Sequence, residues 1–94
     1  MSLLDDVKLA LRISPDTTAF DGEVQDLIEA AKADLRLAGV AEAKLDGSDP
    51  LVKRAVITYS KAHFGWDVPD AERLERAYEM LKAHLTLSQD YREA

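Results

Sequence analysis

Residues 49–66 constrain the fold most, because both ends of one helix are marked there by residue type. The Asp49 carboxylate can cap a first turn, and Pro50 suits the first helical position. Gly65 can adopt the left-handed conformation found just past many helix ends. The sequence therefore predicts one helix between Asp49 and Gly65, near the middle of the chain.

Apolar side chains lie on two sides of this predicted helix. With residues about 100° apart around the axis, one broad arc forms the expected core face: Leu51, Val52, Ala55, Val56, Tyr59, Ala62 and His63. Ile57 and Phe64 fall on roughly the opposite side, where a surface helix of a small monomer is normally polar. We therefore expect a central helix contacted on two sides, either by two layers of its own chain or by its own chain and a neighbouring copy.

The composition is that of a soluble globular protein with one domain and a modest core. Of 94 residues, 47% are hydrophobic and 32% are charged, which argues against disorder. The chain has no cysteine, so it offers no disulfide or thiolate metal site, which fits a reducing cytoplasm. No basic segment followed by an apolar one opens the chain, and no apolar run is long enough to span a bilayer. We expect neither secretion by a signal peptide nor contact with a membrane.

The charge disfavours nucleic acid as a binding partner. A net charge of −6 repels phosphates, and Lys53, Arg54 and Lys61 are too few to form a strong basic patch. Two helices meet at the Gly65 corner, as in a helix-turn-helix, but the second begins with acidic residues where a recognition helix would meet DNA. Of the three functions that the sequence suggests, a nucleic-acid-binding module therefore ranks last.

Two helices are predicted before the central one. The first runs over about residues 3–12, with Ser2 as its cap and a stop at residues 14–16, where a proline cannot continue the helix. The second begins at Thr18 or Asp21, the earlier start being preferred, and ends at Gly39. Its apolar stripe consists of Phe20, Val24, Leu27, Ile28, Ala31, Leu35 and Ala38.

The remaining segments are a long connector, a fourth helix and a C-terminal tail. In the connector, residues 40–48, we expect Val40 and Leu45 to point inward; its length either serves a function or lets the next helix cross the previous one. The fourth helix, capped by Asp67, is predicted to end near Leu87, with Leu74, Ala77, Tyr78, Leu81 and Leu85 as its core stripe. Residues 89–94 show no periodicity and are predicted to be a flexible tail. The fold class is thus all-α, with about four helices and little sheet.

The residues that could carry catalysis or metal binding do not form a site. His63 and His84 lie on separate predicted helices without a nucleophile motif beside them, and His63 is expected to pack in the core. The acidic residues of 67–75 scatter around the fourth helix, as on an ordinary solvated face. We therefore expect no enzyme activity, no metal and no cofactor.

The order of segments resembles that of the small head-tail connector proteins of tailed bacteriophages and prophages. The resemblance rests on Met1–Ile13, Val24–Lys32, Asp49–Ile57 and Phe64–Asp67, and it extends from Leu3 to about Leu87. Proteins of this kind are often described as DNA-packaging or head-completion adaptors. The C-terminal segment departs from the pattern, because it is short and polar after Leu87, whereas in such proteins it can dock on the portal.

The resemblance implies a non-enzymatic, all-α virion protein, made in the bacterial host cytoplasm and placed at the head-tail interface. It implies a homo-oligomeric ring beneath the portal protein that extends the DNA channel, with DNA only as cargo, and that presents a surface to a tail-completion protein. The candidate interface residues are Lys53, Ile57, Phe64, Met80, Leu87, Tyr91 and Arg92. Met80 and Leu87 form a second apolar stripe, and Tyr91 and Arg92 are residue types that often anchor interfaces; a tail without any role is the alternative. The runner-up function is a small acidic helical regulator that binds a protein partner.

Overall fold

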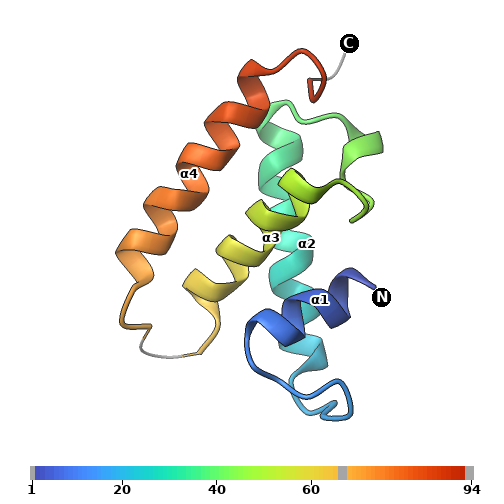
Figure 1. The fold of residues 1–94 in the computed structure, drawn as a ribbon, viewed down its shortest axis with the longest axis vertical. Helices are drawn as coiled ribbons and strands as arrows, with labels where there is room; N and C mark the ends of the chain where they lie inside the picture. The colour runs from blue at the N-terminus through green and yellow to red at the C-terminus, as the bar shows by residue number, and fades with distance from the viewer. Residues whose placement is uncertain (1, 66–67, 93–94) are drawn as a thin grey trace.

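Helix α3, Pro50–His63, lies between the other helices and contacts each of them (Figure 1). The computed structural model describes residues 2–65 and 68–92, and this part of the chain is all-α apart from one isolated β-bridge. Around α3 are α1 (Leu3–Ala10), α2 (Asp21–Ala38), α4 (Ala71–Leu87) and a short 3₁₀ turn, η1 (Glu42–Lys44). Because α4 packs along one side of α3 and α1 and α2 cover another, the prediction of a central helix packed on two sides is confirmed.

The ends of α3 form as their residue types predict. The Asp49 carboxylate accepts hydrogen bonds from the backbone N–H groups of Leu51 and Val52, at 3.1 and 3.0 Å. Gly65 has a φ of 90°, in the left-handed region. Residues 66 and 67 lie outside the described residues. Helix α4 begins at Ala71 with Asp70 in the cap position, so the prediction that Asp67 caps the fourth helix is wrong.

Two further helix boundaries differ from prediction. Helix α1 ends at Ala10, because Arg12 turns into the left-handed region at φ 65° and the Ile13 N–H donates to the Lys8 carbonyl. Helix α2 begins at Asp21, so the preferred start at Thr18 is wrong. The Lys8 ammonium donates to the carbonyls of Pro15 and Thr17, at 3.2 and 2.7 Å, and this holds the connector in a non-helical course.

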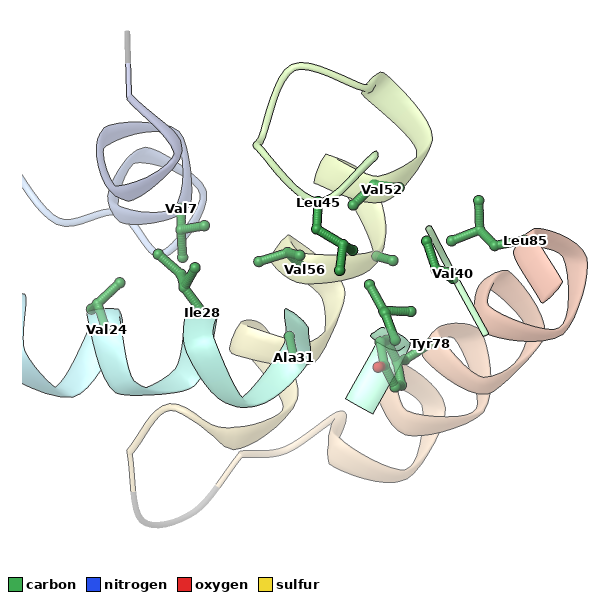
Figure 2. Close-up of a cluster of buried hydrophobic side chains, with 12 residues drawn as sticks. Val7, Val24, Ile28, Ala31, Val40, Leu45, Val52, Val56, Tyr78 and Leu85 are labelled. Atoms are coloured by element: carbon green, nitrogen blue, oxygen red, sulfur yellow. The ribbon is translucent and has the colours of Figure 1, made fainter. Parts of the chain in front are cut away.

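The hydrophobic core gathers side chains from all four helices and from residues 40–48 (Figure 2). Val40 and Leu45 are buried, which confirms that they point inward. The fully buried core residues are Val7, Val24, Ile28, Ala31, Leu35, Val40, Leu45, Val52, Ala55, Val56, Tyr78 and Leu85. Burying a large aliphatic or aromatic side chain stabilises the fold by roughly 1.5–3 kcal/mol.

The buried arc of α3 is shifted from the predicted one. Leu51 is 48% exposed, and His63 is exposed rather than packed in the core. The His63 ring contacts that of Tyr59 with centroids 4.4 Å apart, and its Nε2 lies 4.0 Å from Glu75. Ser60 is buried instead, its hydroxyl satisfied by donating to the Val56 carbonyl at 2.8 Å. His63 lies in the last turn of α3, whereas Ser60 lies nearer its middle.

A polar cluster joins α2 to α4. The Tyr78 hydroxyl and the Lys82 ammonium both donate to the Asp34 carboxylate, at 2.6 and 2.9 Å. Partial burial alone would raise the pKa of Asp34, but these two hydrogen bonds and the Lys82 charge outweigh it and hold the pKa below its ordinary value. Burial, followed by the bond to Asp34, raises the pKa of Tyr78. The cluster therefore keeps a charged carboxylate between the two helices.

The C-terminal segment packs against residues 40–49, so the prediction of an unattached tail is wrong for residues 89–92. The Tyr91 carbonyl accepts a 2.7 Å hydrogen bond from the Ala41 N–H, and the Tyr91 hydroxyl donates to Asp49 at 3.0 Å. Lys44 lies over the Tyr91 ring, and Arg92 forms an antiparallel bridge with Val40. Residues 89–92 therefore lie beside the α2–α3 connector (Figure 1). Residues 93 and 94 are outside the described part.

Candidate interaction surface

A groove of about 780 Å³ lies between α3 and α4, and we call it the α3–α4 groove. Its apolar lining includes Leu51 and Ile57 from α3 and Leu74, Met80 and Leu81 from α4. Leu51 is 48% exposed and Met80 is 65% exposed. Exposed apolar side chains that share one concave surface are typical of a contact site.

The charged residues that line the α3–α4 groove are basic. Lys53, Arg54 and Lys61 line it from α3, His84 lines it from α4, and its lining contains no carboxylate. The Lys53 ammonium is paired with Asp6 of α1 at 3.0 Å. Neither Arg54 nor Lys61 forms an ion pair with another residue of the described ranges. The protein as a whole carries a net charge of −6, so the charge of this groove is opposite in sign to the net charge.

A second hollow of about 920 Å³ lies among α2, α3 and α4, and we call it the acidic hollow. Its carboxylate lining consists of Asp34, Glu72, Glu75 and Glu79. Arg76 and His63 also line it, and Lys82 pairs with Glu79 at 3.1 Å. Side-chain exposure is 92% for Glu72 and 53% for Glu75, so these charges face solvent.

The structure brings three of the predicted interface residues together and separates the others. Lys53, Ile57 and Met80 line the α3–α4 groove. Phe64 instead packs edge-on against Phe20, with ring centroids 5.7 Å apart, in the cap position just past the end of α3. Leu87 is 80% exposed in the last turn of α4.

Tyr91 and Arg92 are also apart from the groove. Tyr91 is half-buried against the α2–α3 connector, and Arg92 pairs through its backbone with Val40.

Sequence reasoning missed half of the groove. The sequence places Leu74, Ala77 and Leu81 in the core stripe of the fourth helix, yet Leu74 and Leu81 are only half-buried and Ala77 is exposed. Arg54 and Lys61 are too few for a DNA-binding patch, and their spacing alone does not indicate a groove. Basic residues recur along α3, and apolar residues recur along α4. This pattern predicts a shared groove only when the two helices are known to be neighbours.

The described residues hold no constellation of metal ligands. No group of three or more His, Asp or Glu side chains in residues 2–65 and 68–92 has metal-binding geometry. His63 and His84 line different hollows and are not brought together. Among the helices described, none is both long and apolar enough to cross a membrane.

Comparison with known proteins gives one match. The family model described as phage connector protein matches residues 3–92. No curated protein and no solved structure matches the chain significantly. The family match spans all four helices and the C-terminal segment through Arg92.

Proposed function

Because the chain belongs to the phage connector protein family, we propose that it is a non-enzymatic structural protein of the virion that forms a ring beneath the portal protein. In this role the ring extends the DNA channel and joins head to tail. Family membership over residues 3–92 is the observation that carries the proposal. Connector proteins are structural components, and the all-α fold with its exposed apolar groove agrees with a subunit that works by contact.

Ring assembly requires each subunit to present surfaces to its neighbours, and the α3–α4 groove supports this. Of the predicted interface residues, we assign Lys53, Ile57 and Met80 to contacts between subunits, since they line the groove together. Leu87, 80% exposed in the last turn of α4, is assigned to a contact with the portal or the tail-completion protein. Phe64 and Tyr91 are assigned to contacts within the subunit because of their aromatic and hydrogen-bond partners.

The charge supports DNA as cargo rather than as a ligand. A lining that binds phosphates would retard DNA passage, and a net charge of −6 opposes such binding. We expect no measurable affinity for duplex DNA near physiological salt in an anisotropy titration. Micromolar affinity would contradict this role and favour the nucleic-acid-binding hypothesis.

The decisive experiment removes the gene from the phage or prophage that carries it. We expect particles to accumulate as DNA-filled heads separate from tails, and the chain to be found by mass spectrometry in complete virions of the parent. A plasmid copy of the gene should restore joined particles. Complete infectious particles formed without the chain would contradict the proposal.

The α3–α4 groove also fits the runner-up, a regulator that binds an amphipathic helix of another protein. That function predicts a chain absent from purified virions and monomeric in the presence of portal protein. The connector predicts presence in virions and assembly on the portal, so the same preparations separate the two.

A further inference from the structure

Two hollows of opposite charge flank helix α4. The α3–α4 groove on one side has Lys53, Arg54 and Lys61 in its lining and no carboxylate. The acidic hollow on the other side includes Glu72 and Glu75. Met80, 65% exposed, borders both hollows. One helix therefore separates a basic apolar surface from an acidic one.

We propose that these hollows are the two halves of one interface between copies of this chain. In this arrangement the acidic edge of α4 in one copy, carrying Glu72 and Glu75, seats against Arg54 and Lys61 in the α3–α4 groove of the next copy. The inference rests on the proposed ring and names the surfaces by which its subunits meet.

The charges within the subunit leave both surfaces able to take a partner. Arg54 and Lys61 pair with no carboxylate of the described residues. Glu72 lies 3.8 Å from Arg76 and Glu75 lies 4.0 Å from the His63 ring; both contacts are long and exposed, so they contribute little and are readily exchanged. Opposite charges on the two surfaces favour encounter in one register and penalise contact between like surfaces.

Exposed apolar side chains beside the groove would add buried apolar surface to the proposed interface. Leu51 and Met80 are 48% and 65% exposed beside the groove, and an adjacent subunit would remove both from water. Met is flexible and adapts to an irregular partner surface. An apolar centre with a charged rim is the usual anatomy of a stable protein interface.

The two surfaces suit a head-to-tail contact. In such a contact each copy uses its acidic edge toward one neighbour and its α3–α4 groove toward the other, and the assembly closes into a ring when the rotation per subunit divides the circle. A two-fold dimer would instead use both surfaces of each copy in one contact and would stop at two copies.

Two charge-reversed variants test the interface. Arg54→Glu/Lys61→Glu reverses the groove, and Glu72→Lys/Glu75→Lys reverses the acidic edge. All four side chains are exposed, so circular dichroism and thermal melting should show folded subunits. Assembly is measured by sedimentation velocity over a concentration series, and by co-sedimentation with portal rings.

We expect each variant alone to weaken self-association by at least about 100-fold, because like charges then face each other. An equimolar mixture of the two should recover assembly to within about tenfold of the parent, since each junction again pairs opposite charges. A matched control, Glu23→Lys/Asp26→Lys on the exposed surface of α2, should assemble like the parent.

The outcomes separate this interface from the ring itself. If the parent forms rings and the groove variant does so equally well, the interface is overturned and the ring stands. Loss of assembly in both variants without recovery in the mixture also overturns it, and indicates that the surfaces contact other proteins. A parent chain that assembles neither alone nor on portal rings overturns both the ring and the interface.

Discussion

Two irregular segments of this protein are held in place by one long side chain each, in different surroundings. The α1–α2 connector is held by Lys8, whose side chain is 2% exposed and whose ammonium contacts the Pro15 and Thr17 carbonyls and, at 2.7 Å, the Asp21 carboxylate. The C-terminal segment is held by Tyr91, which is half-buried and donates to Asp49. At the first attachment Lys8 and Asp21 Oδ1 are buried, although the Asp21 side chain as a whole is 34% exposed, whereas the second attachment is open to water.

This difference decides what each attachment contributes. Asp21 Oδ1 is buried and accepts no hydrogen bond from the described residues, so its ion pair with Lys8 is what compensates its burial. Removing one partner of such a pair leaves an unbalanced charge away from water. At Tyr91, water can replace a lost hydrogen bond, so losing that bond lowers the free energy of unfolding by less than losing the Lys8 ion pair does. The buried Lys8 ammonium therefore ties the α1–α2 connector to the fold more strongly than the Tyr91 hydroxyl ties the C-terminal segment.

The largest effect is expected from Lys8→Met. It removes the ammonium and leaves Asp21 and two carbonyls without their partner, so the free energy of unfolding should fall by about 3–5 kcal/mol. Urea denaturation followed by circular dichroism measures it. The matched control is Lys32→Met, which breaks an ion pair of α2 with Glu29 and should cost less than about 1 kcal/mol. Equal losses in the two variants would remove the distinction between buried and exposed attachments.

A chain ending at Ser88 tests the second attachment. It loses the Tyr91 contacts with Ala41, Lys44 and Asp49, and we expect its melting temperature to fall by about 4–8 °C, with helicity retained. A chain ending at Arg92 keeps these contacts and serves as the control. An unchanged melting temperature in the shorter chain would return residues 89–92 to the unattached tail expected from sequence.

A smaller effect is expected from Tyr91→Phe, which keeps the ring and the backbone bond to Ala41. Only the hydroxyl bond to Asp49 is lost, so the melting temperature should fall by less than about 4 °C. Differential scanning calorimetry resolves this difference. A loss as large as that of the truncated chain would show that the hydroxyl, rather than the whole segment, holds the chain end.

The smallest expected effect is a pH dependence of the stability that the Tyr91–Asp49 hydrogen bond contributes. Partial desolvation, together with the hydrogen bond to Asp49 and the charges of Asp49 and Asp90, raises the pKa of Tyr91. The folded-state pKa then exceeds the unfolded value of about 10. The stabilisation is therefore complete below about pH 10 and is lost as the pH rises through the folded-state pKa. The urea midpoints of the parent and Tyr91→Phe should differ by a constant amount below pH 10 and converge above it; a constant difference at all pH values would contradict the assignment.

Much of the helical framework was predictable because its signals are local. Asp49, Pro50 and Gly65 mark the ends of α3 through contacts within one or two turns, and Ser2 caps α1 in the same way. The start of α2 was missed because a side chain from α1, Lys8, sets the course of the connector before it. Of the candidate site, Lys53, Ile57 and Met80 were identified, but not that they share one groove.

The sequence by itself determined the fold class, the ends of α3, the inward-pointing residues of the α2–α3 connector and the order of segments typical of phage connectors. Those properties follow from residue type and from spacing over a few positions. Only the tertiary structure decided which members of an apolar stripe stay exposed, that Lys8 is buried and that charge separates across α4. The deciding partners are distant in the chain, as with Tyr78 and Asp34, 44 residues apart, or Tyr91 and Asp49, 42 apart. Burial and ion pairing depend on such neighbours, and periodicity along one helix does not specify them.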